Sequence, residues 1–215
     1  MSFGYIGDTS TSVKQQVKNK GILTTQESFD LERQGFLGGS LELIQSQSIT
    51  SSTAQIDFTS IKEDIYDVHF FTYQNYTPAT DGARLIMQFF ESGTLEDAAV
   101  YHTAGDQIRS NGSTNQLKST GVGHIRMGVN VANDDTNQSN NGYVYIYSAG
   151  NSNKYTFTTG HHTGQYYQDG THTTEYGGAV LPQTTTVDGF RLTSFSSGNI
   201  EKLEAKLYGI KQWVI

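Results

Sequence analysis

The chain has 215 residues, enough for one β domain to bury a large core without covalent cross-links. It contains no cysteine, so disulfides, thiolate catalysis and cysteine-bound zinc are excluded. Its formal net charge of −7 argues against a protein that binds a nucleic-acid backbone through clustered Lys and Arg. No apolar run approaches the ~18 residues of a membrane span, and the first ten residues lack the pattern of a signal peptide. We therefore expect a soluble, unprocessed chain that binds no nucleic acid.

The composition favours strands over helices. Gly, Tyr and Phe number 23, 13 and 11, while charged residues make up only 16% of the chain. Long helices need Ala, Leu, Glu and Lys, which are scarce here outside short windows. Short strands joined by Gly-, Asn- and Ser-rich turns are typical of all-β proteins. The predicted fold is an all-β, jelly-roll-like antiparallel sandwich over residues 38–215.

Residues 1–37 are predicted to form an N-terminal arm with short helices over residues 12–20 and 24–34. Thr24 and Glu27 have the spacing of a capping box, in which each side chain satisfies a free backbone N–H of the other. One interpretation is an anchoring segment for assembly, and the other is an extension packed on its own domain. For assembly, the candidate docking residues are the apolar side chains Phe3, Tyr5, Ile6, Val13 and Val17.

The stretch 64–92 is predicted to organise the sandwich. Two apolar runs, 66–71 and 85–90, alternate with period 2, which indicates strands. Between them, Pro78 and the pair Asp81-Gly82 supply turn residues. We predict that these runs form two adjacent antiparallel strands at the centre of the fold.

Further along, Asn111-Gly112 predicts a hairpin with a type I′ turn. Residues 123–131 are predicted to form a strand, and residues 160–178 a loop or flexible hairpin. The last segment fits a helix or a strand, and Gly209 favours the strand.

The histidine-rich stretch is the first candidate site. His161, His162 and His172, with Asp169 and Glu175, have side chains able to ligate a divalent ion. However, the spacing lacks the H-x-x-x-H pattern that converges two histidines on one element, and neighbours in an extended chain point to opposite faces. The acidic loop after residue 133 likewise fails the EF-hand pattern. We predict no metal site and no cofactor.

Tyrosines form the second group of candidates. Tyr166, Tyr167 and Tyr176, with His161, lie in a Gly-rich stretch and could stack on sugar rings or pack against a partner subunit. Subunit packing is the favoured interpretation. Tyr143, Tyr145 and Tyr147 alternate along one predicted strand and are expected near a contact between subunits.

Catalytic patterns are missing from the sequence. It has no G-x-S-x-G elbow, P-loop or G-x-G-x-x-G fingerprint. We therefore predict a protein that is not an enzyme and has no catalytic residues.

Three segments carry a resemblance to a known group of proteins: STAQIDFTSIKEDIYDVHFF, YSAGNSNKY and KLYGIK. In these segments the chain resembles structural proteins of tailed-phage virions, best represented among marine and cyanobacterial phages and described as tail-fibre-like or capsid-decoration proteins. The resemblance implies a β-sandwich located in the virion and bound to other capsid or tail proteins. By analogy with phage appendages it also implies a homotrimer or another homo-oligomer. A receptor-binding module that recognises a host surface glycan is the alternative, and a depolymerase domain is the third choice.

Overall fold

The computed structural model of the chain describes residues 25–26, 41–134, 138–196 and 198–211. The chain divides into two compact units, Met1–Ser40 and Leu41–Ile215. Only Thr25 and Gln26 are described in the first unit, so the expected helical arm lies outside the described residues, as do Phe3, Tyr5, Ile6, Val13 and Val17. Among the residues that are described, no helix is long and apolar enough to cross a membrane.

The second unit is built from antiparallel strands, which confirms the all-β prediction. Its described residues form β1 (Leu41–Ile49), β2 (Gln55–Thr59), β3 (Val68–Pro78), β4 (Leu85–Glu91), β5 (Thr94–Leu95), β6 (Tyr101–Arg109), β7 (Thr114–Val122), β8 (Ile125–Arg126), β9 (Asn140–Tyr147), β10 (Thr156–Gln165), β11 (His172–Leu181), β12 (Val187–Ser194) and β13 (Ile200–Ile210).

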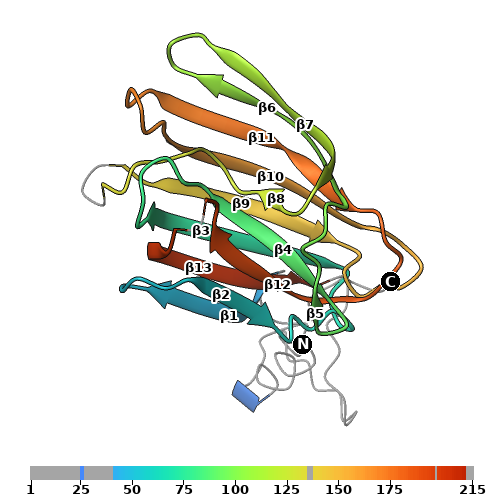
Figure 1. Ribbon diagram of the computed structural model, residues 1–215. Coiled ribbons are helices and arrows are strands. Elements are labelled where there is room, and N and C mark those ends of the chain that lie inside the picture. Colours follow the sequence, from blue (N-terminus) through green and yellow to red (C-terminus); the bar gives the residue numbers. More distant parts are fainter. Residues whose placement is uncertain (1–24, 27–40, 135–137, 197, 212–215) are drawn as a thin grey trace, which may run out of the picture. The chain divides into compact units, whose positions relative to one another are not determined.

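The strands form two sheets, arranged as a sandwich (Figure 1). The large sheet has the order β1-β13-β3-β9-β10-β11-β6-β7. The small sheet has the order β2-β12-β4-β5, and β8 also pairs with β4. Buried apolar side chains from both sheets make a single core cluster.

Eight of the strands pair in a nested order. β1 pairs with β13, β2 with β12, β3 with β9, and β4 with β8. Two hairpins interrupt this order along the chain: β6–β7 comes before β8, and β10–β11 comes between β9 and β12. These four inserted strands, which we call the extension, lengthen the large sheet beyond β9 (Figure 1).

The expected pairing at the centre of the fold is wrong. The run 66–71 contributes to β3 in the large sheet and the run 85–90 to β4 in the small sheet, so the two strands belong to different sheets. Period-2 alternation shows which residues share a face, but it does not show which strand lies alongside. The turn residues between the runs carry the chain from one sheet to the other.

Aromatic rings from both sheets meet in the core. Phe58 and Phe190 of the small sheet stack with centroids 4.9 Å apart, and Phe71 of the large sheet meets them edge-on at 5.5 and 5.2 Å. Burying one such side chain contributes about 1.5–3 kcal/mol to the stability of the fold, so these three rings contribute strongly to the packing of one sheet on the other.

Two local expectations are revised. The β6–β7 hairpin forms at Asn111-Gly112, but only Gly112 has a positive φ (86°), and its N–H donates to the Arg109 carbonyl at 2.9 Å. That geometry is a type I turn followed by a left-handed Gly, since a type I′ turn needs positive φ at two residues.

The strand expected at 123–131 is reduced to the two residues of β8, and Gly128 then has a φ of 101°. Of the two alternatives expected for residues 160–178, the hairpin forms, and these residues make up most of the regular β10–β11 pair.

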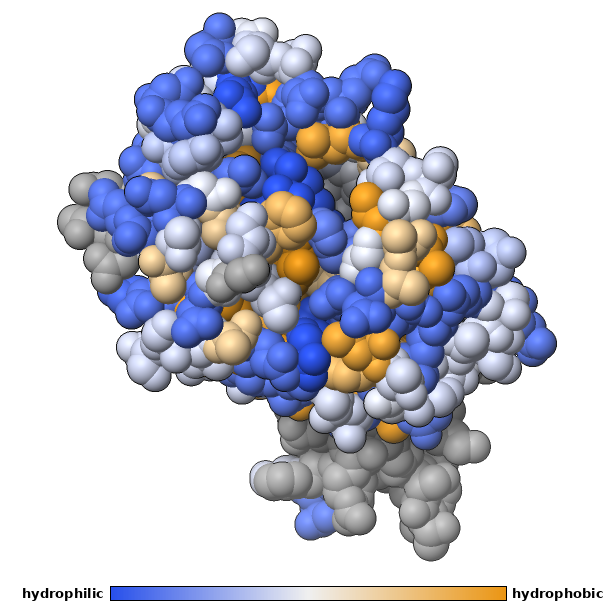
Figure 2. Space-filling model, in the orientation of Figure 1, coloured by the Kyte–Doolittle hydropathy of each residue, from blue (hydrophilic) through white to orange (hydrophobic). Residues whose placement is uncertain are grey.

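Hydrophilic residues dominate the face of the molecule seen in Figure 2, and the apolar residues there form separate groups. Scattered apolar residues are ordinary on a protein surface.

Candidate functional site

Three glycines lie side by side across neighbouring strands of the extension. Gly160 of β10 faces Gly177 of β11, and Gly177 also faces Gly105 of β6. Val144 of β9 continues this line on one side and Leu117 of β7 on the other. We call the three glycines the glycine row; it belongs to the inner face, because its strand neighbours on the same face, such as Thr158, are buried.

Close backbone approach explains why glycine occupies these positions. A Cβ on Gly177 would lie 2.4 Å from the Ala104 carbonyl oxygen, and one on Gly105 would lie 2.5 Å from the Tyr176 carbonyl oxygen. Both distances are shorter than real contacts, so any larger residue would force the strands apart. The result is a strip of bare backbone three strands wide.

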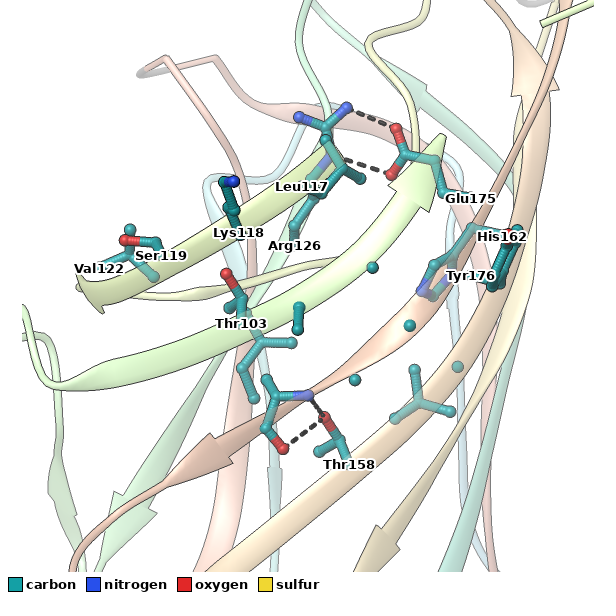
Figure 3. A pocket seen from close by; sticks show the side chains of 18 of the residues that line it. Thr103, Leu117, Lys118, Ser119, Val122, Arg126, Thr158, His162, Glu175 and Tyr176 are labelled. Atoms are coloured by element: carbon teal, nitrogen blue, oxygen red, sulfur yellow. Dashed lines mark hydrogen bonds and ion pairs between the residues drawn. The ribbon is translucent and has the colours of Figure 1, made fainter. Parts of the chain in front are cut away.

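A pocket of about 240 Å³ lies above this strip (Figure 3). Its floor is the glycine row, with Thr158, Ala179 and Thr103 as the next row along the strands. The opposite wall is formed by residues at and before β8, and Arg84 also lines the pocket. The pocket is therefore enclosed by the extension on one side and the edge of the small sheet on the other.

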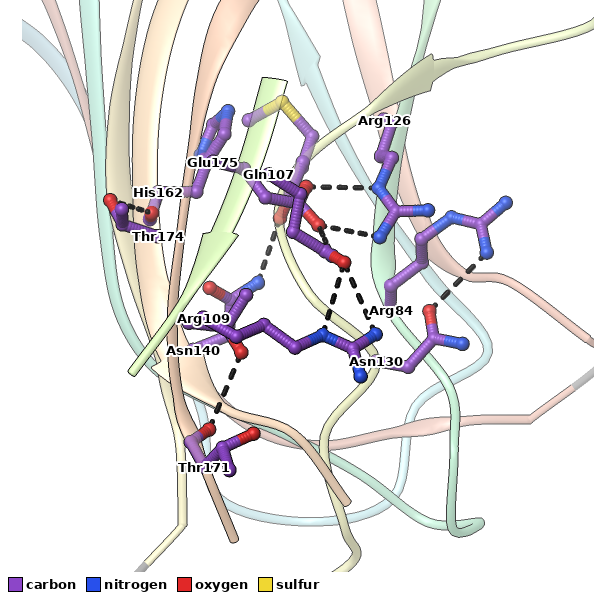
Figure 4. A network of polar contacts seen from close by, with 12 residues as sticks. Arg84, Gln107, Arg109, Arg126, Asn130, Asn140, His162, Thr171, Thr174 and Glu175 are labelled. Atoms are coloured by element: carbon purple, nitrogen blue, oxygen red, sulfur yellow. Dashed lines mark hydrogen bonds and ion pairs between the residues drawn. The ribbon is translucent and has the colours of Figure 1, made fainter. Parts of the chain in front are cut away.

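Glu175 anchors a polar network at one end of the pocket (Figure 4). Arg126 donates to its carboxylate through Nε at 2.9 Å and Nη2 at 2.5 Å, and Gln107 donates through Nε2 at 2.5 Å. The Glu175 side chain is 4% exposed and that of Arg126 25%. Arg109 extends the network, since it donates to Gln107 Oε1 and lies 3.8 Å above the Tyr166 ring.

His162 lies directly opposite Glu175 in the β10–β11 pairing. The Tyr73 hydroxyl donates to the Met127 carbonyl at 2.7 Å and lies 3.0 Å from His162 Nδ1. Because that hydroxyl has one hydrogen, Nδ1 is the donor to its oxygen, and Nε2 is left as an acceptor beside Gly160. Burial, followed by the positive charge of His161 and of Arg126, lowers the pKa of His162 to about 3, so the ring is neutral at pH 7.

Positive charge gathers on the other wall. Arg84 lies 3.9 Å above the Phe195 ring and donates to Asn130 Oδ1 at 3.3 Å, while its buried Nε has no hydrogen-bond partner. Burial, followed by the charge of Arg126, lowers the Arg84 pKa to about 10. The pKa of His124 is lowered to about 4 by burial and by the same two arginines. Two cations therefore share the single carboxylate of Glu175.

The outer face of the large sheet carries rings in contact across strands. Phe70 lies 4.8 Å from Tyr145 and 6.2 Å from Tyr208, and Tyr145 lies 6.2 Å from Tyr147. Tyr143 lies 6.0 Å from Tyr145 and 6.1 Å from His161. We call these residues, with Tyr176, the aromatic face. The side chains of Tyr143 and Tyr176 are exposed.

The structure separates the tyrosines that the sequence grouped together. Tyr176 is in β11 on the aromatic face, next to His161 in register. Tyr166 and Tyr167 belong to the loop after β10, with their rings 5.1 Å apart. Tyr167 packs against Gly82, where a Cβ would lie 2.9 Å from the ring.

The histidines do not converge. His161 points to the aromatic face and contacts Thr174 Oγ1 at 2.5 Å, whereas His162 points inward, as the alternation of an extended chain requires. Glu175 is occupied by Arg126 and Gln107. Within the described parts of the chain, no group of three or more His, Cys, Asp or Glu side chains could hold a metal ion.

Sequence reasoning missed most of the pocket. Arg84, Arg126 and the glycine row were not singled out, and Glu175 was considered only as a metal ligand. The one available signal was glycine inside runs that otherwise favour strands, since such a glycine often marks close backbone approach.

Comparison of the chain with protein-family models, with curated proteins and with solved structures gave no match.

Proposed function

We propose that this chain is a non-enzymatic structural protein of a tailed-phage virion, either a capsid decoration or a tail or fibre component. The support for a virion role is the resemblance of residues 52–71, 147–155 and 206–211 to proteins of that group. The N-terminal segment attaches the chain to other virion proteins, and the second unit is displayed as a β-sandwich.

The second unit is a jelly roll in this proposal. Nested pairing of first with last strand, second with seventh, third with sixth and fourth with fifth is the order that results when one long hairpin rolls into two sheets. The pairs β1–β13, β2–β12, β3–β9 and β4–β8 follow that order. The extension is then an addition to a jelly-roll core.

The aromatic face carries the proposal that the protein is a homo-oligomer. Rows of rings on one sheet face leave an apolar surface that association would cover, and Tyr suits an interface because its hydroxyl finds a partner when the ring is buried. The occupant we propose is a second copy of this chain.

Charge along this face supports that occupant. One row of the face runs in register from Lys206 through Thr72, Tyr143, His161 and Tyr176 to Asp106. Five strand spacings, about 24 Å, separate its basic end from its acidic end. In a closed symmetric assembly, Lys206 of one copy can meet Asp106 of another.

Sedimentation tests the proposal. The wild-type chain should sediment as an oligomer at micromolar concentration, with three copies expected from the phage resemblance. Tyr145→Lys should shift it toward monomer while the melting temperature stays within a few degrees. Thr193→Lys, which places a lysine on the small sheet instead, is the matched control and should leave the oligomer intact. A monomeric wild type would contradict self-association, and an undisturbed Tyr145→Lys oligomer would place the contact elsewhere.

A charge reversal checks the register of the contact. Asp106→Lys should weaken the oligomer by repulsion from Lys206, and Asp106→Lys combined with Lys206→Asp should restore it. Lys206→Asp alone should weaken the oligomer as Asp106→Lys does. If both single variants weaken the oligomer and the double variant does not restore it, this pairing is excluded.

A further inference from the structure

We propose that the pocket above the glycine row binds an acidic saccharide residue, a sugar ring that carries one carboxylate and several hydroxyl groups. This inference goes beyond the virion role and uses residues on the opposite face of the sheet from the proposed oligomer contact. Either proposal can therefore fail without the other.

The floor of the pocket suits a flat ring. Gly160, Gly177 and Gly105 leave no side chain above the sheet, so a ligand can approach the backbone directly. Val144 and Leu117 lie at the two ends of the row and offer apolar contact. A sugar ring presents C–H groups on its faces, and these can rest on such a strip while its substituents point outward.

The charges of the pocket favour a carboxylate. Glu175 already accepts hydrogen bonds from Arg126 and Gln107. Arg84 makes no ion pair with a described carboxylate, and its Nε is buried without a partner. Glu175 attracts Arg84 without a direct contact, so this partly buried cation has only a share of one carboxylate, and a bound anion would balance the excess positive charge. Bidentate contact with a carboxylate is the geometry that guanidinium groups prefer.

Uncharged polar groups lie where hydroxyls could reach them. His162 Nε2 is an acceptor without a protein partner, and it lies beside Gly160 at the floor. The hydroxyls of Thr103 and Ser119 belong to the adjoining row of the pocket. A purely inorganic anion would leave these groups unused, whereas a sugar ring would use them together with the arginines.

The volume sets the size of the ligand. At about 240 Å³ the pocket is slightly below the ~300–1,000 Å³ of sites for drug-sized molecules. One sugar residue fits this space, and a longer saccharide would have to extend through the mouth.

Calorimetric titration of the full chain with D-glucuronate tests the inference, with D-glucose, acetate and inorganic phosphate as comparison probes. Saturable binding of glucuronate is expected, with a dissociation constant below about 10 mM. Glucose, acetate and phosphate should each bind at least about tenfold weaker, which corresponds to about 1.4 kcal/mol. Absence of glucuronate binding overturns the proposal. Equal binding of phosphate or acetate also overturns it, because the site would then recognise only an anion.

Substitutions locate the binding. Arg84→Met should weaken glucuronate binding at least about tenfold, the scale expected for a lost charge-assisted contact, and Arg84→Lys should recover part of it. Arg191→Met is the matched control, since Arg191 also lies over a phenylalanine ring, that of Phe90, but on the outer face of the small sheet. Unchanged affinity in Arg84→Met would overturn the assignment of the carboxylate to this wall.

A second pair of variants avoids the charged residues. Ser119→Phe places a ring in the pocket and should abolish binding, whereas Thr114→Phe, at an exposed position of the same strand, should not. Binding that survives Ser119→Phe would place the ligand outside this pocket.

Discussion

The Tyr73 hydroxyl and His162 Nδ1 lie 3.0 Å apart and join β3 to β10 across the intervening β9. Both side chains are buried, and the Tyr73 hydroxyl donates a hydrogen bond to the Met127 carbonyl. The contact needs a hydrogen on Nδ1. Separately, burial disfavours the charged ring and, with the charges of His161 and Arg126, lowers the pKa of His162 to about 3 from an ordinary value of 6.5.

The lowered pKa of the buried His162 predicts that the free energy of unfolding falls as the pH drops below about 6.5. Between pH 6.5 and about 3 the unfolded chain binds a proton at His162 that the folded chain does not bind, so acid favours unfolding. Each such group contributes at most about 1.4 kcal/mol per pH unit in that window. The pKa values of His69 and His124 are lowered too, so they act in the same direction.

Urea unfolding at pH 7.5, 6 and 5 measures the slope. His162→Gln removes the titrating group and should make stability less dependent on pH, although it lowers stability at pH 7.5. The exposed His172 provides the control His172→Gln, which should keep the wild-type slope. An unchanged slope in His162→Gln would mean that His162 takes up its proton in the folded state as readily as in the unfolded one.

The glycine row predicts that adding one methyl group at Gly177 lowers the stability of the fold substantially. In Gly177→Ala the Cβ would lie 2.4 Å from the Ala104 carbonyl oxygen, so β11 and β6 must separate. Overpacking of this kind typically costs about 1–3 kcal/mol. Gly121→Ala, whose Cβ would lie 3.3 Å from the Ala99 carbonyl oxygen, needs only a small local shift and should cost clearly less than Gly177→Ala. Equal melting temperatures for the two variants would show that the strands can separate at little cost.

The buried ion pair predicts strong coupling. Glu175→Gln leaves Arg126 without its carboxylate and should destabilise the fold by about 3–5 kcal/mol. The double variant Glu175→Gln/Arg126→Met removes both charges and should lose less than the sum of the two single variants. Unfolding in denaturant gives the coupling energy from the four proteins.

The pair Asp57–Arg191 is the matched control. It has the same two-contact geometry, with both distances 2.7 Å, but its side chains are 31% and 22% exposed. The two arginines are similarly exposed, 22% for Arg191 and 25% for Arg126, so the contrast lies in the carboxylates, of which Asp57 is partly exposed and Glu175 is buried. A pair whose carboxylate is partly solvated is screened more, so its coupling should be the smaller of the two. Equal coupling in both cycles would show that burial does not strengthen the Arg126–Glu175 pair.

The sequence predicted strand character well because alternation is a local property. The β9 run with Tyr143 and Tyr145 and the β13 run with Gly209 were both expected as strands, and both form. Pairing was harder. The runs that became β3 and β4 were expected side by side, yet they lie in opposite sheets, because a crossing between sheets uses the same turn residues as a hairpin.

The pocket depends almost entirely on pairing. Gly105, Gly160 and Gly177 come together only through the register of three strands, and Arg126 reaches Glu175 across 49 residues. Composition left the Gly-rich stretch 160–178 open between a loop and a hairpin. In the structure those glycines allow regular strands to approach closely.

The last prediction concerns the first unit. Deleting residues 1–36 should leave a folded sandwich that no longer joins the particle. The core cluster described in the second unit is made by residues between Ile44 and Leu207, so the sandwich has a core of its own. Circular dichroism and thermal melting should therefore match the full chain within a few degrees, while binding to the other virion proteins is lost. Val13→Asp/Val17→Asp in the full chain provides a milder test and should reduce that binding without changing the melt. Aggregation of the truncated chain would instead show that the arm belongs to the folded domain.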